Sequence, residues 1–229
     1  MLPNTQLKNI NDLKSGDVIL CYCNPNNSIV AEGIYKVTAS EYCHAAIYYG
    51  DSLAAESMAK DGIKKGKIGK VRIQDLISRY EHVAVLRQPD AWVGSDRINA
   101  LKLFIDKVVE NEAKYNFKGV LSFKSRKELH EENIHEKLES FFNNLTAPAS
   151  PEKSSYFCSE FVSDCFIAVG FIDPSAAVLF QSDTYSPGDL GKEPAFGTFW
   201  GYLAKDNNYV VPESDYYYRV STYDAIFGL

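Results

Sequence analysis

Short apolar runs separated by turn residues fill the first third of the chain. The run that ends at Cys23 follows the turn Ser15-Gly16-Asp17, and the run 43–49 ends at the turn signal Gly50-Asp51. Such runs, bounded by glycine and aspartate, indicate β-strands, and the second run is expected to fold back on the next one as a hairpin. The segment 29–37 fits a helix or a strand. We predict strands at 13–23, 43–49, 52–58 and 82–87, and an exposed strand pair or a loop at 62–73.

The middle of the chain has the helical spacing of apolar residues. The segment 95–114 is predicted to be an amphipathic helix capped by Ser95 or Asp96. The segment 125–145 is charged and has only a thin apolar stripe, so we interpret the region around 120–153 as a charged helical insertion. A further helix begins near Cys158, with Ser154 or Ser155 as its cap, and ends at Gly170. Its predicted buried stripe is Phe161, Val162, Cys165, Phe166 and Val169.

The order of these elements decides the fold class. Strands dominate the first third and helices the middle, which is an α+β pattern and differs from the alternation of a parallel α/β fold. The length of 229 residues fits a single domain, 1–229. The stretch 186–190 is predicted to be a turn, and the tyrosine-rich tail 209–229 is predicted to add a strand.

Composition narrows the classes of partner. The net charge of −6 provides no basic surface for nucleic acid. No apolar stretch reaches the roughly 18 residues of a membrane span, and the N-terminus lacks the pattern of a signal peptide. Five cysteines are an odd number that does not indicate a disulfide framework. We expect a protein of the cytoplasm, or one exported without a Sec signal; the oligomeric state stays open.

Cys158 lies where the last predicted helix begins. Backbone N–H groups are unpaired at a helix start and carry partial positive charge, which stabilises a thiolate and lowers its pKa below about 8.5. The same N–H groups can bind a developing oxyanion. Cys158 is therefore either a catalytic nucleophile or a small buried residue, and the first alternative needs a histidine.

His44 is the best candidate for that base. His130 and His135 lie in the charged segment, and His82 fits a buried structural histidine. If the chain turns about Gly50, residues whose numbers sum to 100 face each other, so His44 lies opposite Glu56. Glu56 is an isolated acid among small residues, and its carboxylate could accept the Nδ1–H of His44, which is the third role of a catalytic triad.

Other polar residues have simpler explanations. Glu160 suits the first turn of a helix, where an acid interacts favourably with the helix dipole. Asp17 fits a turn residue, while Arg87 and Lys36 are cations that could bind an acidic substrate. A zinc site from Cys21, Cys23, Cys43 and His44 is the weaker alternative, because neighbours in a strand point oppositely. Cys21, Cys23 and Cys165 fit buried apolar residues.

Four stretches together resemble a known family. They are LKSGDVIL at 13–20, CHAAIYYG with AAES at 43–57, YFCSEFV at 156–162 and SPGDL at 186–190. Their order resembles the NlpC-type papain-like hydrolases, in particular the circularly permuted YiiX/YebB-like group, in which the histidine strand precedes the cysteine helix. The match runs from about residue 13 to 190. Ala45-Ala46 departs mildly from the Val-Gly that is frequent there.

The resemblance implies a circularly permuted papain-like α+β fold, with a small antiparallel sheet or barrel packed against the nucleophile helix. It implies a cysteine hydrolase with Cys158 as nucleophile, His44 as base and Glu56 as orienting acid, without metal or organic cofactor. Tyr156 matches a family tyrosine that could help hold the oxyanion; its alternative is a core or rim tyrosine. The expected partner is an amide-containing substrate: a peptide, a peptidoglycan fragment or an acyl amide. A papain-like acyltransferase or lipid-acting enzyme and a catalytically silent binding module remain alternatives.

Overall fold

The fold is built on an open sheet of eight strands. The computed structural model describes residues 7–24, 32, 35, 36, 38, 40–58, 66–88, 96–143, 150–173, 176 and 180–227, with side chains to 221. The strands are β1 (Val18–Tyr22), β2 (Tyr42–Gly50), β3 (Leu53–Met58), β4 (Lys67–Arg72), β5 (His82–Arg87), β6 (Lys114–Tyr115), β7 (Ser155–Tyr156) and β8 (Thr198–Ala204). Their order in the sheet is β7-β6-β4-β3-β2-β1-β5-β8. Every pair is antiparallel except β6 with β7. The α+β class is confirmed, but the sheet is larger than the small sheet or barrel that was expected.

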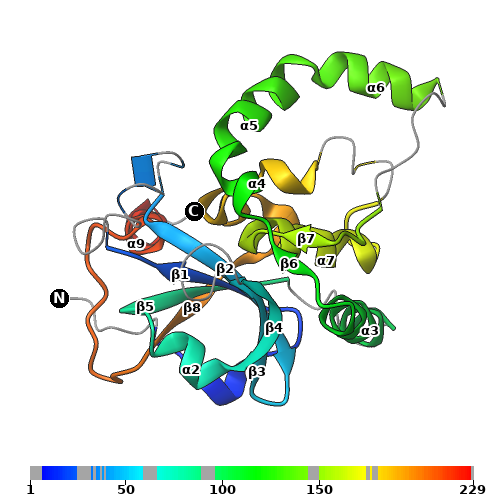
Figure 1. Ribbon diagram of the computed structural model, residues 1–229. Helices are drawn as coiled ribbons and strands as arrows, with labels where there is room; N and C mark the ends of the chain where they lie inside the picture. The colour runs from blue at the N-terminus through cyan, green and yellow to red at the C-terminus, as the bar shows by residue number, and fades with distance from the viewer. Residues whose placement is uncertain are drawn as a thin grey trace.

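Helices lie against both faces of this sheet (Figure 1). They are α2 (Ile73–Ile77), α3 (Arg97–Glu110), α4 (Phe117–Leu121), α5 (Phe123–Glu132), α6 (Ile134–Phe142), α7 (Cys158–Ala168), α8 (Pro187–Leu190) and α9 (Tyr216–Phe227), with 3₁₀ turns η1 (Ile10–Asp12), η3 (Ser182–Thr184) and η4 (Pro194–Phe196). Successive strand residues point to opposite faces, so β1 contributes to two cores. Leu20 packs in the larger core with α3 and α7, whereas Ile19 and Cys21 pack in the smaller core with α2. Burial on both faces explains why β1 is a continuous apolar run.

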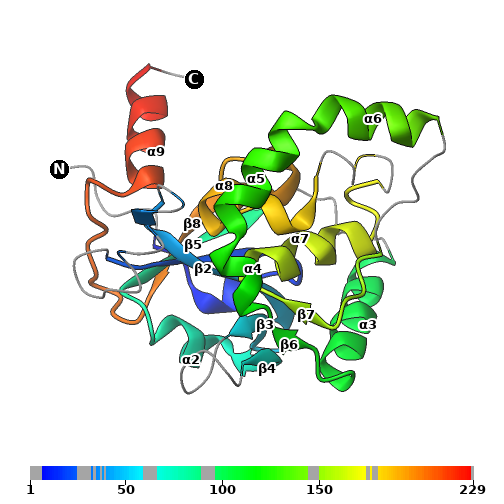
Figure 2. The ribbon, with the colours of Figure 1, turned by 45° about the horizontal axis from the view of Figure 1, so that its top comes forward.

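The charged segment forms two helices rather than one. Helices α5 and α6 meet at Asn133, whose side chain donates to the Leu129 carbonyl and closes the last turn of α5. Figures 1 and 2 both show these helices extending away from the sheet, above α7. Leu129 and Phe142 are 57% and 75% exposed. These two apolar side chains thus add little to the core.

The C-terminal third departs most from the sequence expectations. The predicted strand in the tail is wrong, because residues 216–227 form α9. Asp215 accepts the backbone N–H groups of Tyr217 and Tyr218, and this capping outweighs the strand preference of the tyrosines. Strand β8 was missed, and the predicted turn at 186–190 is the short helix α8. Most of the ambiguous segment 29–37 lies outside the described residues.

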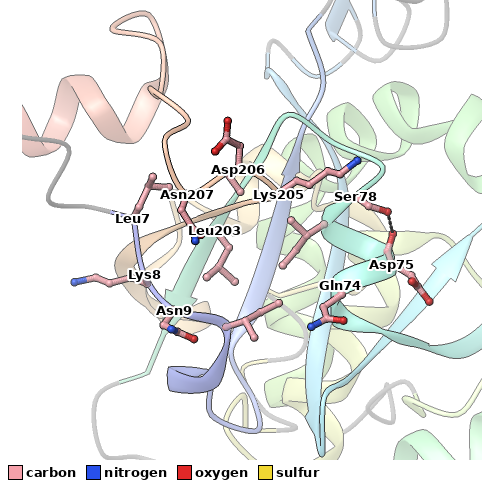
Figure 3. A pocket seen from close by; sticks show the side chains of 13 residues that line it. Leu7, Lys8, Asn9, Gln74, Asp75, Ser78, Leu203, Lys205, Asp206 and Asn207 are labelled. Carbon is pink, nitrogen blue, oxygen red and sulfur yellow. Dashed lines mark hydrogen bonds between the residues drawn. The ribbon is translucent and has the colours of Figure 1, made fainter.

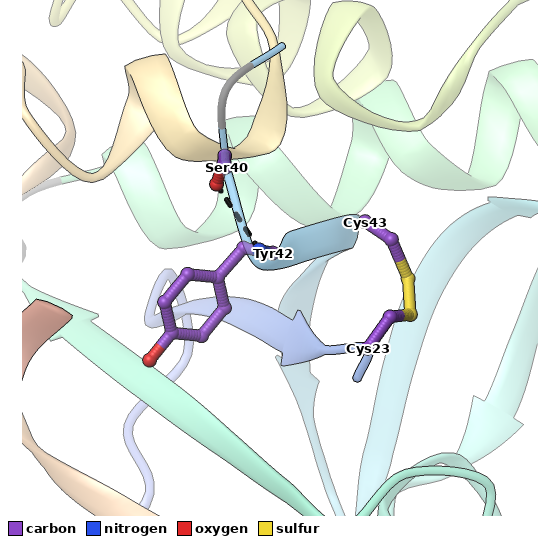
Figure 4. Close-up of a disulfide and its surroundings, with 4 residues drawn as sticks. All are labelled: Cys23, Ser40, Tyr42 and Cys43. Atoms are coloured by element: carbon purple, nitrogen blue, oxygen red, sulfur yellow. Dashed lines mark hydrogen bonds between the residues drawn. A yellow bond between two sulfur atoms is a disulfide. The ribbon is translucent and has the colours of Figure 1, made fainter. Parts of the chain in front are cut away.

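A disulfide joins the ends of the two central strands β1 and β2. Cys23 follows β1, Cys43 lies in β2, and their Cα atoms are 5.7 Å apart (Figure 4). The interpretation of Cys23 as an unpaired buried residue is therefore wrong. Cys21, Cys158 and Cys165 are free and buried. A cysteine count cannot identify such a pair, because the strand register decides which thiols meet.

Candidate functional site

Cys158 is the first residue of α7, as the sequence indicates. The predicted serine caps are wrong, because Ser155 belongs to β7 and Phe157 occupies the N-cap position without a side-chain cap. Glu160 replaces them: its carboxylate accepts the Phe157 N–H at 3.1 Å. The predicted stripe of α7 is buried, and Gly170 follows the helix with a positive φ of 71°. The local sequence therefore fixes where the thiol lies.

His44 and Glu56 meet on the face of the sheet that carries the smaller core. The predicted register is wrong by two residues, since Glu56 is paired with Ala46 and not with His44. The turn is centred on Asp51 and Ser52, both with positive φ, and the ladder is irregular between Tyr48 and Gly50. A shift of two residues keeps every side chain on its face. His44 is thus a diagonal neighbour of Glu56, and its Nε2 lies 2.8 Å from Glu56 Oε2.

The imidazole lies between the acid and the thiol. Glu56 occupies Nε2, where the sequence interpretation had assigned Nδ1, so Nδ1 is the nitrogen left for Cys158. Burial lowers the pKa of His44, but hydrogen bonds with Cys158 and Glu56 outweigh it and raise the pKa to about 9. Burial raises the pKa of Glu56, but the hydrogen bonds and charges of His44 and Arg79 lower it by more. The net pKa of Glu56 therefore lies below its ordinary value.

Cys158 has the opposite balance from an ordinary buried thiol. Burial raises its pKa, but the hydrogen bond with His44, the imidazolium charge and backbone hydrogen bonds at Ala45 and Ser159 bring it below the ordinary value. Burial raises the pKa of the other free thiols, Cys21 and Cys165. Cys158 and His44, each 7% exposed, thus shift each other's pKa toward the charged forms, a thiolate and an imidazolium.

Tyr156 lies apart from this arrangement through its hydroxyl. That hydroxyl donates to the Pro151 carbonyl at 2.8 Å and accepts the Lys153 N–H at 2.7 Å. The ring is fully buried and packs edge-on against Phe161. The oxyanion role stays a prediction, and the contacts agree with the alternative of a core tyrosine.

Sequence reasoning missed three residues around the site. Arg79 and Tyr80 contact Glu56 and His44, and Tyr115 lies near the thiol: burial raises the pKa of Tyr115, and the charge of Cys158 raises it further. Arg79 and Tyr80 follow α2, and Tyr115 belongs to a strand of two residues. Segments this short carry no periodic signal, so their positions follow only from the tertiary fold.

The remaining candidates are held in structural contacts. Arg87 binds both carboxylate oxygens of Asp17, and Asp17 also accepts the Lys14 N–H of the turn before β1. Lys36 pairs with Glu32. The disulfide removes Cys23 and Cys43 from the zinc alternative, and no cluster of metal-binding side chains occurs within the described parts of the chain. In the same residues, no helix has the length and hydrophobicity of a membrane span.

A separate hollow of about 800 Å³ lies between α2 and the end of β8 (Figure 3). Its lining includes the apolar Leu7, Ile77 and Leu203 and the basic Lys8 and Lys205. None of the predicted site residues lines it. The chemistry that the sequence indicates is therefore not located in this hollow.

Comparisons with known proteins give limited likenesses. No protein-family model matches the chain. A curated protein of Escherichia coli (strain K12), "Probable lipoprotein peptidase YaeF", is 26% identical over 189 residues, which cover 78% of this chain and 63% of the relative. The match thus spans less than two thirds of that relative. The crystal structure of the metalloprotein yiiX from Escherichia coli O157:H7, DUF1105, superposes with a TM-score of 0.40 at 14% identity, over 82% of this chain and 88% of that chain.

Proposed function

We propose that the protein is a cysteine hydrolase of the YiiX/YebB-like, circularly permuted papain-like group, acting on an amide bond of a peptide. The observation that carries the proposal is the buried chain of contacts from Cys158 through His44 to Glu56. Its protonation balance favours a thiolate beside an imidazolium. The name of the relative, a probable lipoprotein peptidase, agrees with this class of reaction.

The proposed reaction has two halves. The Cys158 thiolate attacks the amide carbonyl, and the oxyanion that forms is received by backbone N–H groups at the start of α7. His44 then gives its proton to the leaving amine, which leaves a thioacyl-enzyme. In the second half His44 takes a proton from water as the resulting hydroxide attacks the thioester. Collapse of the tetrahedral intermediate expels the Cys158 thiolate, releases the acid and restores the thiolate–imidazolium pair. Glu56 keeps the imidazole oriented and supports its positive charge.

The test is the pH dependence of alkylation by iodoacetamide, followed for each cysteine by peptide mass spectrometry. We expect Cys158 to react with an inflection below the value of about 8.5 of a free thiol, while Cys21 and Cys165 remain slow in the same sample. His44→Ala is expected to move the inflection up or abolish it. A screen of amide substrates with wild type and Cys158→Ser then tests turnover. An ordinary thiol profile at Cys158, unchanged in His44→Ala, would contradict the proposal and favour the binding module.

A further inference from the structure

The carboxylate of Glu56 has two partners, one at each oxygen. Its Oε2 meets His44, and its Oε1 accepts a hydrogen bond from the Arg79 guanidinium at 2.7 Å. The Glu56 side chain is 8% exposed and that of Arg79 is 28% exposed. A buried carboxylate is costly unless it is paired and hydrogen-bonded, so the arginine is what allows Glu56 to remain charged there.

The next residue in the chain contacts the imidazole itself. The Tyr80 ring stacks on His44, with ring centroids 6.1 Å apart and an angle of 13° between the planes. The backbone N–H groups of Arg79 and Tyr80 donate to Leu76 and Ile77 at the end of α2, which fixes both residues on one short turn. That turn therefore supports the acid and the imidazole from the same side.

We propose that Arg79 is a positioning residue of the reaction, holding Glu56 ionised and aimed at His44, with Tyr80 restricting the plane of the imidazole. The inference rests on the proposed function and extends it from three residues to five. Arg79 contacts Glu56, and Tyr80 contacts His44. Both act through His44 and Glu56.

The charges of the cluster show what the arginine contributes. Cys158 thiolate, His44 imidazolium, Glu56 carboxylate and Arg79 guanidinium sum to zero. Burial raises the pKa of the other titratable neighbours, Cys21, Tyr80 and Tyr115, so they stay neutral near pH 7. Removal of the arginine leaves one net negative charge, which favours protonation of every remaining member. The pKa values of Cys158 and His44 should then rise together.

This joint rise separates a positioning role from mere support of the fold. A loosened fold would separate the thiol from the imidazole, so the pKa of Cys158 would rise while that of His44 fell toward its ordinary value. The experiment therefore follows both groups: iodoacetamide alkylation reports Cys158, and NMR of ring-labelled histidine reports His44. Arg72→Met is the matched control, because Arg72 precedes the same helix and pairs with the exposed Asp75.

In Arg79→Met we expect both inflections to move up by about one pH unit, so that Cys158 alkylation at the wild-type midpoint falls about fivefold. Arg79→Lys keeps the positive charge, so both inflections should lie close to their wild-type values. Arg72→Met should change neither inflection. Unchanged inflections in Arg79→Met, or a fall in the pKa of His44, would overturn the inference while leaving the proposed function in place. If wild type itself lacks the low inflection, the proposed function fails, and the inference fails with it.

Discussion

The Cys23–Cys43 disulfide should make a measurable contribution to stability. It links residues separated by 20 positions and closes the loop between two central strands. In the chain-entropy treatment a closed loop of this length stabilises the folded state by about 3 kcal/mol, because the crosslink restricts the unfolded chain. A chain of this size loses about 2–4 °C of melting temperature per kcal/mol. Reduction, or the substitution Cys23→Ser, should therefore lower Tm by roughly 6–12 °C.

Thermal unfolding followed by circular dichroism, with and without the reductant TCEP, measures this difference. Cys23→Ser is the control for the reductant, because without the crosslink its melting temperature should not respond to TCEP. Alkylation of the denatured, unreduced protein should label Cys21, Cys158 and Cys165 only. Equal melting temperatures of the oxidised and reduced wild type, or labelling of all five cysteines, would refute the reasoning.

Two further predictions concern stability away from the disulfide. Burial raises the pKa of Asp164 to about 7, against the opposing effects of Lys153 and Ser182. The folded state then holds a proton that the unfolded state releases between about pH 4 and 7, so this group's contribution falls as pH rises through that window. The wild type should lose unfolding free energy between pH 5 and pH 8, and in Asp164→Asn this loss should be smaller by about 2 kcal/mol. Urea titration at the two pH values measures the difference. A variant that shows the full wild-type loss would contradict the prediction. Phe142 lies on the exposed end of α6, so Phe142→Ser should change the unfolding free energy by less than about 0.5 kcal/mol. Phe161 is in the core, so Phe161→Ala should lower the unfolding free energy by about 3–5 kcal/mol. A large effect at Phe142 would mean that α6 is covered in solution.

The hairpin shows why much of the site could be predicted from the sequence. The assumed turn about Gly50 was wrong, yet His44 and Glu56 still meet, because the error of two residues preserves the face on which a strand residue lies. The start of α7 was predictable for a related reason: the apolar spacing of the helix fixes its first turn, so Cys158 was placed to within a residue. The periodicity of a strand or helix therefore still predicts which side chains share a face when the geometry of a loop is predicted wrongly.

Features that depend on contacts between distant segments could not be predicted. Arg79 reaches Glu56 across 23 positions, and it follows a helix of only five residues, which is too short for its periodicity to be recognised in the sequence. The pairing of Cys23 with Cys43 depends on the register of β1 with β2. The tail was mistaken for a strand because its tyrosines favour strands, whereas Asp215 begins a helix there.

The short strands β6 and β7 bring the two ends of the charged helical segment close together. The chain leaves the sheet after Tyr115 and returns at Ser155, and these two strands are neighbours that pair in parallel. Adjacent strands lie only about 5 Å apart, so the insertion begins and ends at nearly the same point of the sheet. The distance between the two strand ends therefore sets no minimum length for the segment that joins them. That segment also lies outside β2 and β3, the strands that carry His44 and Glu56.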